Sequence, residues 1–266
     1  MAAVRSKVWG KLTARDGAAA HLREVLLLVG AYFTYMLVRK IIVPGADSIG
    51  FENAVRVISF EKDLGFFWEL DLQAWALEGG KAVALVFNYL YIGTLFPIIL
   101  TTGVLFYFRN RKRYFYYRGL ILLSFAVALV VFASFPLAPP RMITTEGIAD
   151  TVALYGPPWY ASREAAAFYN AFAAMPSLHF AWTVLFGFLF WNTGPKFLKL
   201  VGILYPTVTF LAITITGNHY IIDAIAGALM MLFVFLLYEG IFRGRYRQAL
   251  AYVRATVANG RSERAQ

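Results

Sequence analysis

The chain has 266 residues, of which 60% are hydrophobic, 17% are aromatic and none is cysteine. Soluble domains are about 45–50% apolar, so part of this chain faces something other than water, and the lack of cysteine excludes disulfides and thiolate metal sites. The net charge of +10 suits nucleic acid or an anionic membrane surface. Because the basic residues flank apolar runs, we exclude a nucleic-acid binder.

Six apolar segments are long enough to cross a bilayer, which takes roughly 20 residues per helix. In chain order they cover residues 24–43, 82–108, 119–138, 177–193, 197–217 and 219–242. Backbone groups without partners are too costly in hydrocarbon, so each segment is predicted to be a helix. The sequence thus predicts an all-α, polytopic membrane protein that is a six-transmembrane helix bundle.

The remaining segments divide the chain simply. Residues 1–23 form a basic N-terminal segment without the features of a cleaved signal peptide, residues 24–242 form one membrane domain, and residues 243–266 form a basic tail. Between spans one and two, residues 44–81 are predicted to add one or two interfacial helices, because aromatic residues of the kind found at headgroup level gather there. A short Ala-rich helix is expected near residues 161–173.

Lysine and arginine in short loops predict the orientation, because such loops stay on the cytoplasmic side. Basic residues crowd the N-terminal segment, the connection 109–118, the turn 196–199 and the tail beyond 243. These four segments alternate along the chain as one membrane face requires. Both termini are therefore predicted to be cytoplasmic, and the turn near 217–218 is predicted to be extracytoplasmic.

Two of the three histidines lie in polar clusters at predicted helix starts. Residues 175–179, Met-Pro-Ser-Leu-His, open the fourth span, and residues 217–223, Gly-Asn-His-Tyr-Ile-Ile-Asp, open the sixth. Arg141 follows two prolines at the exit of the third span. The loop charges place all three clusters at the extracytoplasmic face. The other histidine, His21, is expected to be an ordinary surface residue.

His219 and Asp223 are four residues apart, a spacing that puts two side chains on one face of a helix. A carboxylate inside a membrane protein is costly without a partner, and an imidazole N–H is a suitable one. The carboxylate then sets the tautomer and leaves the other ring nitrogen as a base or nucleophile. The alternative is a structural pair that only satisfies itself.

His179 is expected in the first turn of a helix, where free backbone N–H groups bind anions. Ser177 adds a hydroxyl or serves only as an N-cap, and Arg141 suits bidentate phosphate binding or lies at the interface without function. Together with His219 and Asp223, these residues suit transfer of a phosphate ester without a metal. A zinc site of two histidines and one aspartate is the alternative.

These motifs resemble the type-2 phosphatidic acid phosphatase superfamily, whose pattern includes Pro-Ser-Gly-His and His-x-x-x-Asp. The matches are PPR at 139–141, PSLH at 176–179 and HYIID at 219–223. They are most similar to the branch that includes inositol phosphorylceramide synthase, and residues 61–75 resemble bacterial members of that branch. The resemblance covers about residues 50–242 and implies a membrane-bound enzyme that needs no cofactor and no metal.

The resemblance also implies roles for three residues in catalysis. His219 attacks phosphorus and becomes a phosphohistidine, and Asp223 orients it. His179 protonates the leaving oxygen and then activates the acceptor. A transporter or structural membrane protein, with these polar residues in a pathway, is the non-enzymatic alternative.

Phosphate binding is implied for Arg141 and for the helix start at Ser177 and Leu178, with Asn218 as a substitute donor. Substitutes are needed because the superfamily's lysine falls at Ser134 and its Ser-Arg pair falls at residues 212–213, which are Ala and Ile. Leu178 also replaces the usual glycine. A weaker candidate cation is Arg163.

We therefore expect an enzyme in the cytoplasmic membrane of a bacterium, with its site on the extracytoplasmic side. Its partners are membrane lipids, and its substrate is a phospholipid or a polyprenyl phosphate. The motif departures favour a lipid phosphotransferase, which passes the phosphate group to an alcohol. The alternative is a lipid phosphate phosphatase that hydrolyses phosphatidate or a prenyl pyrophosphate.

Overall fold

The computed structural model describes residues 17–42, 46–157, 172–193 and 195–243. Within these ranges the protein is all helical and has no strand. The expected Ala-rich helix, Arg163 and the tail beyond 243 lie outside the described residues, as does most of the N-terminal segment.

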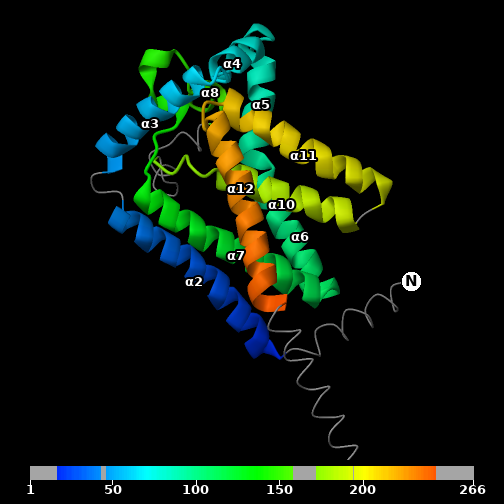
Figure 1. Ribbon diagram of the computed structural model, residues 1–266. Helices are drawn as coiled ribbons and strands as arrows, with labels where there is room; N and C mark the ends of the chain where they lie inside the picture. Colours follow the sequence, from blue (N-terminus) through cyan, green and yellow to red (C-terminus); the bar gives the residue numbers. More distant parts are fainter. Residues whose placement is uncertain (1–16, 43–45, 158–171, 194, 244–266) are drawn as a thin grey trace, which may run out of the picture.

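Ten α-helices carry the described part of the fold (Figure 1). They are α2 (Ala18–Ile42), α3 (Ala46–Asp63), α4 (Glu69–Glu78), α5 (Lys81–Gly93), α6 (Leu95–Arg109), α7 (Arg111–Ser134), α8 (Thr151–Tyr155), α10 (Leu178–Thr193), α11 (Lys196–Ile215) and α12 (Ile221–Tyr238). Two short 3₁₀ turns, Pro140–Met142 and Thr144–Glu146, follow α7, and a π-helical turn, Glu239–Arg243, follows α12.

Five helical segments in the described residues are long and apolar enough to cross a membrane: α2, α5 with α6, α7, α11 and α12. The protein is an integral membrane protein. The fourth predicted span, residues 177–193, corresponds to α10, which has 16 residues and is therefore about 24 Å long. That is shorter than the roughly 30 Å of a hydrocarbon core, so a sixth crossing stays a prediction.

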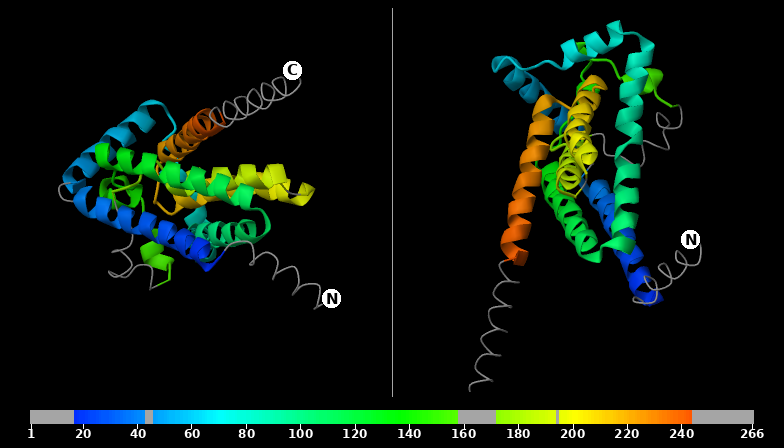
Figure 2. Two further views of the ribbon diagram at one scale, coloured as in Figure 1. Left: turned by 90° about the horizontal axis from the view of Figure 1, so that it is seen from below. Right: turned by 90° about the vertical axis from the view of Figure 1, so that its right-hand side faces the viewer.

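Helices α10 and α11 form an antiparallel hairpin that packs against α12 and α5 (Figures 1 and 2). Their backbones approach closely at two glycines. A Cβ atom built on Gly187 would lie 2.5 Å from the carbonyl oxygen of Gly202, and one on Gly202 would lie 2.6 Å from that of Gly187. Small residues at such a crossing let helices pack tightly where water does not drive association. The hairpin therefore returns the chain to the end from which α10 started.

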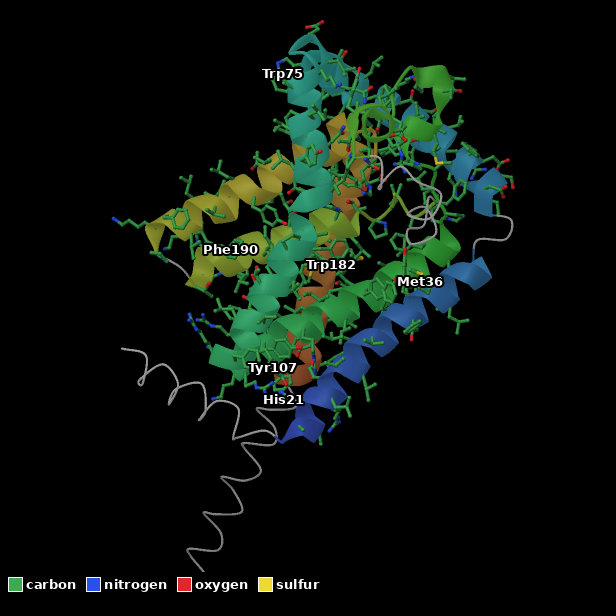
Figure 3. All side chains as sticks on the ribbon, turned by 180° about the vertical axis from the view of Figure 1, so that it is seen from behind. His21, Met36, Trp75, Tyr107, Trp182 and Phe190 are labelled. Carbon is green, nitrogen blue, oxygen red and sulfur yellow. The ribbon has the colours of Figure 1, made fainter. Side chains whose placement is uncertain are left out.

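Helices α3 and α4 lie together at one end of the molecule, with Trp75 on α4 labelled there in Figure 3. Their formation agrees with the prediction of one or two helices in residues 44–81, and their place at the membrane surface stays a prediction. On α3 the buried side chains are Asn53, Ala54, Val57, Ile58 and Glu61. This spacing gives the helix one buried face, and Glu61 continues that face at its C-terminal end.

The opposite end holds a polar cluster that joins α2 to α6 and α7. His21 Nδ1 makes a hydrogen bond with the hydroxyl of Tyr107, and both are labelled in Figure 3. Glu24 accepts hydrogen bonds from Arg118 at 2.6 Å and from the hydroxyl of Tyr114 at 2.7 Å. The expectation that His21 is an ordinary surface residue was wrong, because packing of α2 half-buries its ring against Tyr107.

Candidate active site

His219 lies in the turn between α11 and α12, and its imidazole is held by two acceptors. Nδ1 lies 2.9 Å from the carbonyl oxygen of Ala174 and 3.4 Å from Oδ2 of Asp223. Because a carbonyl and a carboxylate only accept hydrogen bonds, we assign the proton to Nδ1. Nε2 of His219 then keeps its lone pair. The residue is 8% exposed, so little water reaches it.

Asp223 contacts His219 as predicted, although the expected geometry was wrong. Helix α12 begins at Ile221, so His219 precedes the helix and does not share a helical face with Asp223. The contact arises because Asp223 turns back toward the N-terminal end of the helix, where its Oδ2 also accepts from the Tyr220 N–H at 3.0 Å. The Asp223 side chain is fully buried.

The start of α10 packs directly against the first turns of α12. The Ser177 side chain accepts from the Phe180 N–H at 3.2 Å, which makes Ser177 an N-cap, and the Ser177 N–H donates to the carbonyl oxygen of Asp223 at 3.0 Å. Gly227 on α12 permits this approach, because a Cβ atom there would lie 2.4 Å from the Ser177 carbonyl oxygen. These contacts hold the two histidine-bearing segments together.

His179 lies in the first turn of α10, as expected from the sequence. Its ring stacks on that of Tyr91 from α5, with centroids 4.7 Å apart and planes inclined by 23°. The Nε2 atom of His179 is buried and has no hydrogen-bond partner within the described residues. An unpaired buried nitrogen is costly, and a substrate oxygen is a suitable partner for it.

Arg141 lies in the 3₁₀ turn after α7, beside the turn that carries His219. Its backbone N–H donates to the carbonyl oxygen of Gly217 at 2.9 Å, and Gly217 has a positive φ of 67°, which glycine adopts without strain. The guanidinium donates to Oδ1 of Asn218 and pairs with Asp150, with Nε 3.2 Å from Oδ2. The structure thus brings Arg141 to the histidine cluster.

Asn218 and Leu178 interact mainly with the protein itself. The Asn218 side-chain oxygen accepts from Arg141, and its Nδ2 donates to Oγ1 of Thr216 at 2.8 Å. The Leu178 side chain packs against the apolar cluster between α7, α10 and α12. Asn218 therefore orients Arg141, while Leu178 has only its backbone N–H to offer a phosphate; direct phosphate binding by either stays a prediction.

The positions where the superfamily's other cations are expected carry none. Ser134 is exposed, and its hydroxyl donates to the carbonyl oxygen of Val130 at 3.0 Å. Ala212 and Ile213 are fully buried. The Ile213 carbonyl oxygen accepts from the N–H groups of both Asn218 and His219 at 3.1 Å, so this position shapes the turn through its backbone.

Two residues that the sequence analysis missed contact the start of α12. Glu61 from α3 and Glu69 from α4 are both fully buried. Oε1 of Glu61 accepts from the Ile222 N–H at 2.8 Å, and Oε1 of Glu69 accepts from the Ile221 N–H at 2.7 Å. For Glu61 the available signal was an acidic residue on the mostly apolar buried face of α3, which is unusual for a buried position.

Comparison with known families shows which superfamily the chain belongs to. A sequence model of the PAP2 superfamily matches residues 55–237, which include every candidate site residue and more than half of the chain. The chain belongs to the PAP2 superfamily. Members of this superfamily are phosphoryl-transfer enzymes that act on lipid phosphates, so a non-enzymatic transporter has no support.

No curated protein and no solved structure matches this PAP2 chain. In the part of the chain that the structure describes, no group of three or more His, Cys, Asp or Glu side chains is arranged to hold a metal ion. The function of this chain is therefore inferred from its superfamily and from the contacts of His219 and Arg141.

Proposed function

We propose that this protein is a lipid phosphotransferase that passes the phosphate group of a membrane lipid to an alcohol through a phosphohistidine on His219. The observation that carries the proposal is the pair of acceptors on Nδ1 of His219, at 2.9 Å and 3.4 Å. They leave Nε2 as the nucleophilic nitrogen, as an activated nucleophile requires.

The first step breaks the phosphate ester of the lipid. The Nε2 lone pair of His219 attacks phosphorus, the bond from phosphorus to the leaving oxygen breaks, and His179, which is protonated once the phosphate anion is bound beside it, gives that oxygen a proton. Asp223 stabilises the positive charge that develops on the His219 ring. Arg141 and the backbone at the α10 start hold the phosphate oxygens, which carry negative charge throughout.

The second step regenerates the enzyme. Neutral His179 takes the proton from an acceptor O–H, the acceptor oxygen attacks phosphorus, and the bond from phosphorus to Nε2 of His219 breaks. His179 ends protonated, as it began, and no metal takes part. His219 and His179 thus act in both steps. His179 is the acid in the first step and the base in the second.

Two observations support transfer to an alcohol over hydrolysis. His219 is only 8% exposed, and a site that excludes water protects a reactive intermediate from hydrolysis. In addition, Ser134 and Ile213 replace cations of the phosphatase pattern, and neither supplies a charge. The alternative product, inorganic phosphate, is an outcome of the experiment below.

We also propose that the site faces the extracytoplasmic side and that α10 crosses the membrane as the fourth of six spans. The basic turn between α6 and α7 lies at one end of α7, and Arg141 follows the other end, 24 helical residues away. That separation is about 36 Å at 1.5 Å per residue. The positive-inside rule puts the basic turn in the cytoplasm, so Arg141 and the histidines lie on the opposite side.

The test uses the full-length protein purified in detergent. It is incubated with phospholipids, phosphatidate and polyprenyl phosphates, with and without inositol, diacylglycerol or ceramide as acceptor. His219→Ala is compared with His21→Ala, which removes the histidine at the far end. A new phosphate ester of the added alcohol made by wild type and His21→Ala alone supports the transferase. Transfer of the same group to water by these two alone, which releases inorganic phosphate from phosphatidate or a polyprenyl phosphate, supports the phosphatase. Unchanged turnover in His219→Ala contradicts the proposed nucleophile.

A further inference from the structure

The start of α12 receives two carboxyl groups from a distant part of the chain. Glu61 and Glu69, called the carboxyl pair below, lie 161 and 152 residues before the amides that they contact, Ile222 and Ile221. Both side chains are fully buried, and the second carboxyl oxygen of each has no hydrogen-bond partner within the described residues. Each carboxyl therefore accepts one hydrogen bond from α12, and the two carboxyls lie against each other.

A helix start exposes N–H groups that the helix itself cannot satisfy, and a buried one needs a protein acceptor. In α12 each of the first amides has one. Tyr220 donates to Asp223 Oδ2 at 3.0 Å, Ile221 donates to Glu69, and Ile222 donates to Glu61. Because the pair takes two of these amides, Asp223 binds only one of them and keeps Oδ2 near His219.

Two carboxyl groups can be buried together at the start of α12 because one of them is neutral. Burial, and then the negative charge of Glu69, raise the pKa of Glu61 to about 9, and burial raises the pKa of Glu69. Two adjacent buried carboxyls do not both ionise near neutral pH, so Glu61 is neutral there. The positive end of the α12 dipole favours a negative charge on Glu69.

Other titratable groups also face the carboxyl pair. From α12 and the preceding turn they are Asp223 and Tyr220, whereas His219 faces Asp223. Glu146, from the 3₁₀ turn Thr144–Glu146, faces Tyr220 and pairs at 2.7 Å with Lys62, the residue next to Glu61 in the chain. None of these groups accepts a hydrogen bond from the amides of Ile221 or Ile222, so the pair alone satisfies them.

We propose that Glu61 and Glu69 are positioning residues for the nucleophile: they hold the first turn of α12 so that Asp223 stays directed at His219. This inference rests on the proposed function of His219 and Asp223. Without the pair, the amides of residues 221 and 222 lose their acceptors. Asp223 is the nearest carboxylate on their own helix, and it turns to cap them. His219 Nδ1 then keeps only the Ala174 carbonyl.

The test reads the His219 tautomer directly, so it does not depend on finding the lipid. The chain has 3 histidines, and ¹⁵N-histidine labelling of the full-length protein with His21→Ala and His179→Ala variants assigns each ring. Wild type is expected to show His219 with its proton on Nδ1 in one conformation. Glu61→Ala and Glu69→Ala are expected to keep the proton on Nδ1, because the Ala174 carbonyl still accepts it, but to show a shifted or broadened His219 Nδ1 signal. Glu52→Ala, an exposed position on α3, is expected to match wild type.

Conservative variants distinguish positioning from general stability. Glu61→Gln keeps a neutral acceptor and is expected to match wild type at pH 7 in the His219 spectrum. Glu61→Asp and Glu69→Asp keep the acid but draw it back by one methylene, and they are expected to disturb the His219 ring as the alanine variants do. These variants decide the question if the alanine variants do not fold.

Turnover gives a second readout, using whichever lipid of the panel above wild type converts. Loss of the contact lowers kcat by about 10²-fold, the cost of a small misplacement, with KM changed less than about twofold because the pair does not touch the substrate. A wild-type His219 spectrum in folded Glu61→Asp and Glu69→Asp overturns the positioning role. Full activity of His219→Ala overturns the proposed function, whatever the carboxyl pair shows.

Discussion

His219 Nδ1 lies closer to the carbonyl oxygen of Ala174, at 2.9 Å, than to the carboxylate of Asp223, at 3.4 Å. The Ala174 carbonyl, a neutral acceptor, therefore sets the tautomer of His219 together with Asp223. Ala174 belongs to the segment that leads into α10. The segment with His179 thus also fixes the ring of His219. This arrangement differs from a simple His–Asp pair, and it changes what each substitution is expected to do.

Asp223→Asn is expected to lower kcat by about 10²-fold, less than the roughly 10⁴-fold that follows where the carboxylate alone sets the tautomer. The Ala174 carbonyl still accepts from Nδ1, so the ring keeps its tautomer and loses only the charge that stabilises its protonated form. Initial rates on the converted lipid measure the loss, and His219→Asn gives the floor. An Asp223→Asn variant as inactive as His219→Asn argues against the carbonyl's role.

Arg141→Lys is expected to lower kcat/KM by at least about tenfold, because an ammonium group does not reproduce the planar contacts of a guanidinium. Asn218→Ala is expected to have a smaller effect in the same direction, since it removes one partner that orients Arg141. The measurement is kcat/KM for the anionic lipid at two salt concentrations. A matched substitution is Arg56→Lys, on the exposed side of α3, and it is expected to change nothing.

Gly227→Ala is expected to destabilise the protein by about 1–3 kcal/mol, the usual cost of overpacking. The new Cβ meets the Ser177 carbonyl oxygen at 2.4 Å, which forces α10 and α12 apart at the site. Gly103→Ala is the control, because a Cβ there meets nothing within 4 Å. Thermal unfolding in detergent measures both, and equal melting temperatures for the two variants count against the close contact.

Stability is expected to fall as pH rises, because of Glu61. Its pKa is about 9 in the folded protein and about 4.3 in an unfolded chain, so the folded state binds the proton more tightly. The contribution of Glu61 is full below pH 4.3, declines as pH rises between these values, and is lost above about 9. Thermal unfolding of wild type and Glu61→Gln from pH 5 to pH 9 tests this, and parallel curves contradict it.

The sequence by itself was enough for the membrane character of the protein, its helical composition and most of the candidate site. Long apolar runs predict helices because backbone groups in lipid must pair within their own segment. The motifs around residues 139–141, 176–179 and 217–223 predicted the cluster, because loop charges place all three at one end. These are local properties, and periodicity and composition display them directly.

Only the tertiary structure decided which atoms hold the catalytic candidates. The Ala174 carbonyl, the stacked ring of Tyr91 and the carboxyl pair reach the site from other segments, and no local pattern encodes such contacts. The same holds for His21 against Tyr107 and for the start of α12 after His219. Each depends on how helices cross and how deeply they pack, which closely approaching glycines and buried acceptors determine in three dimensions.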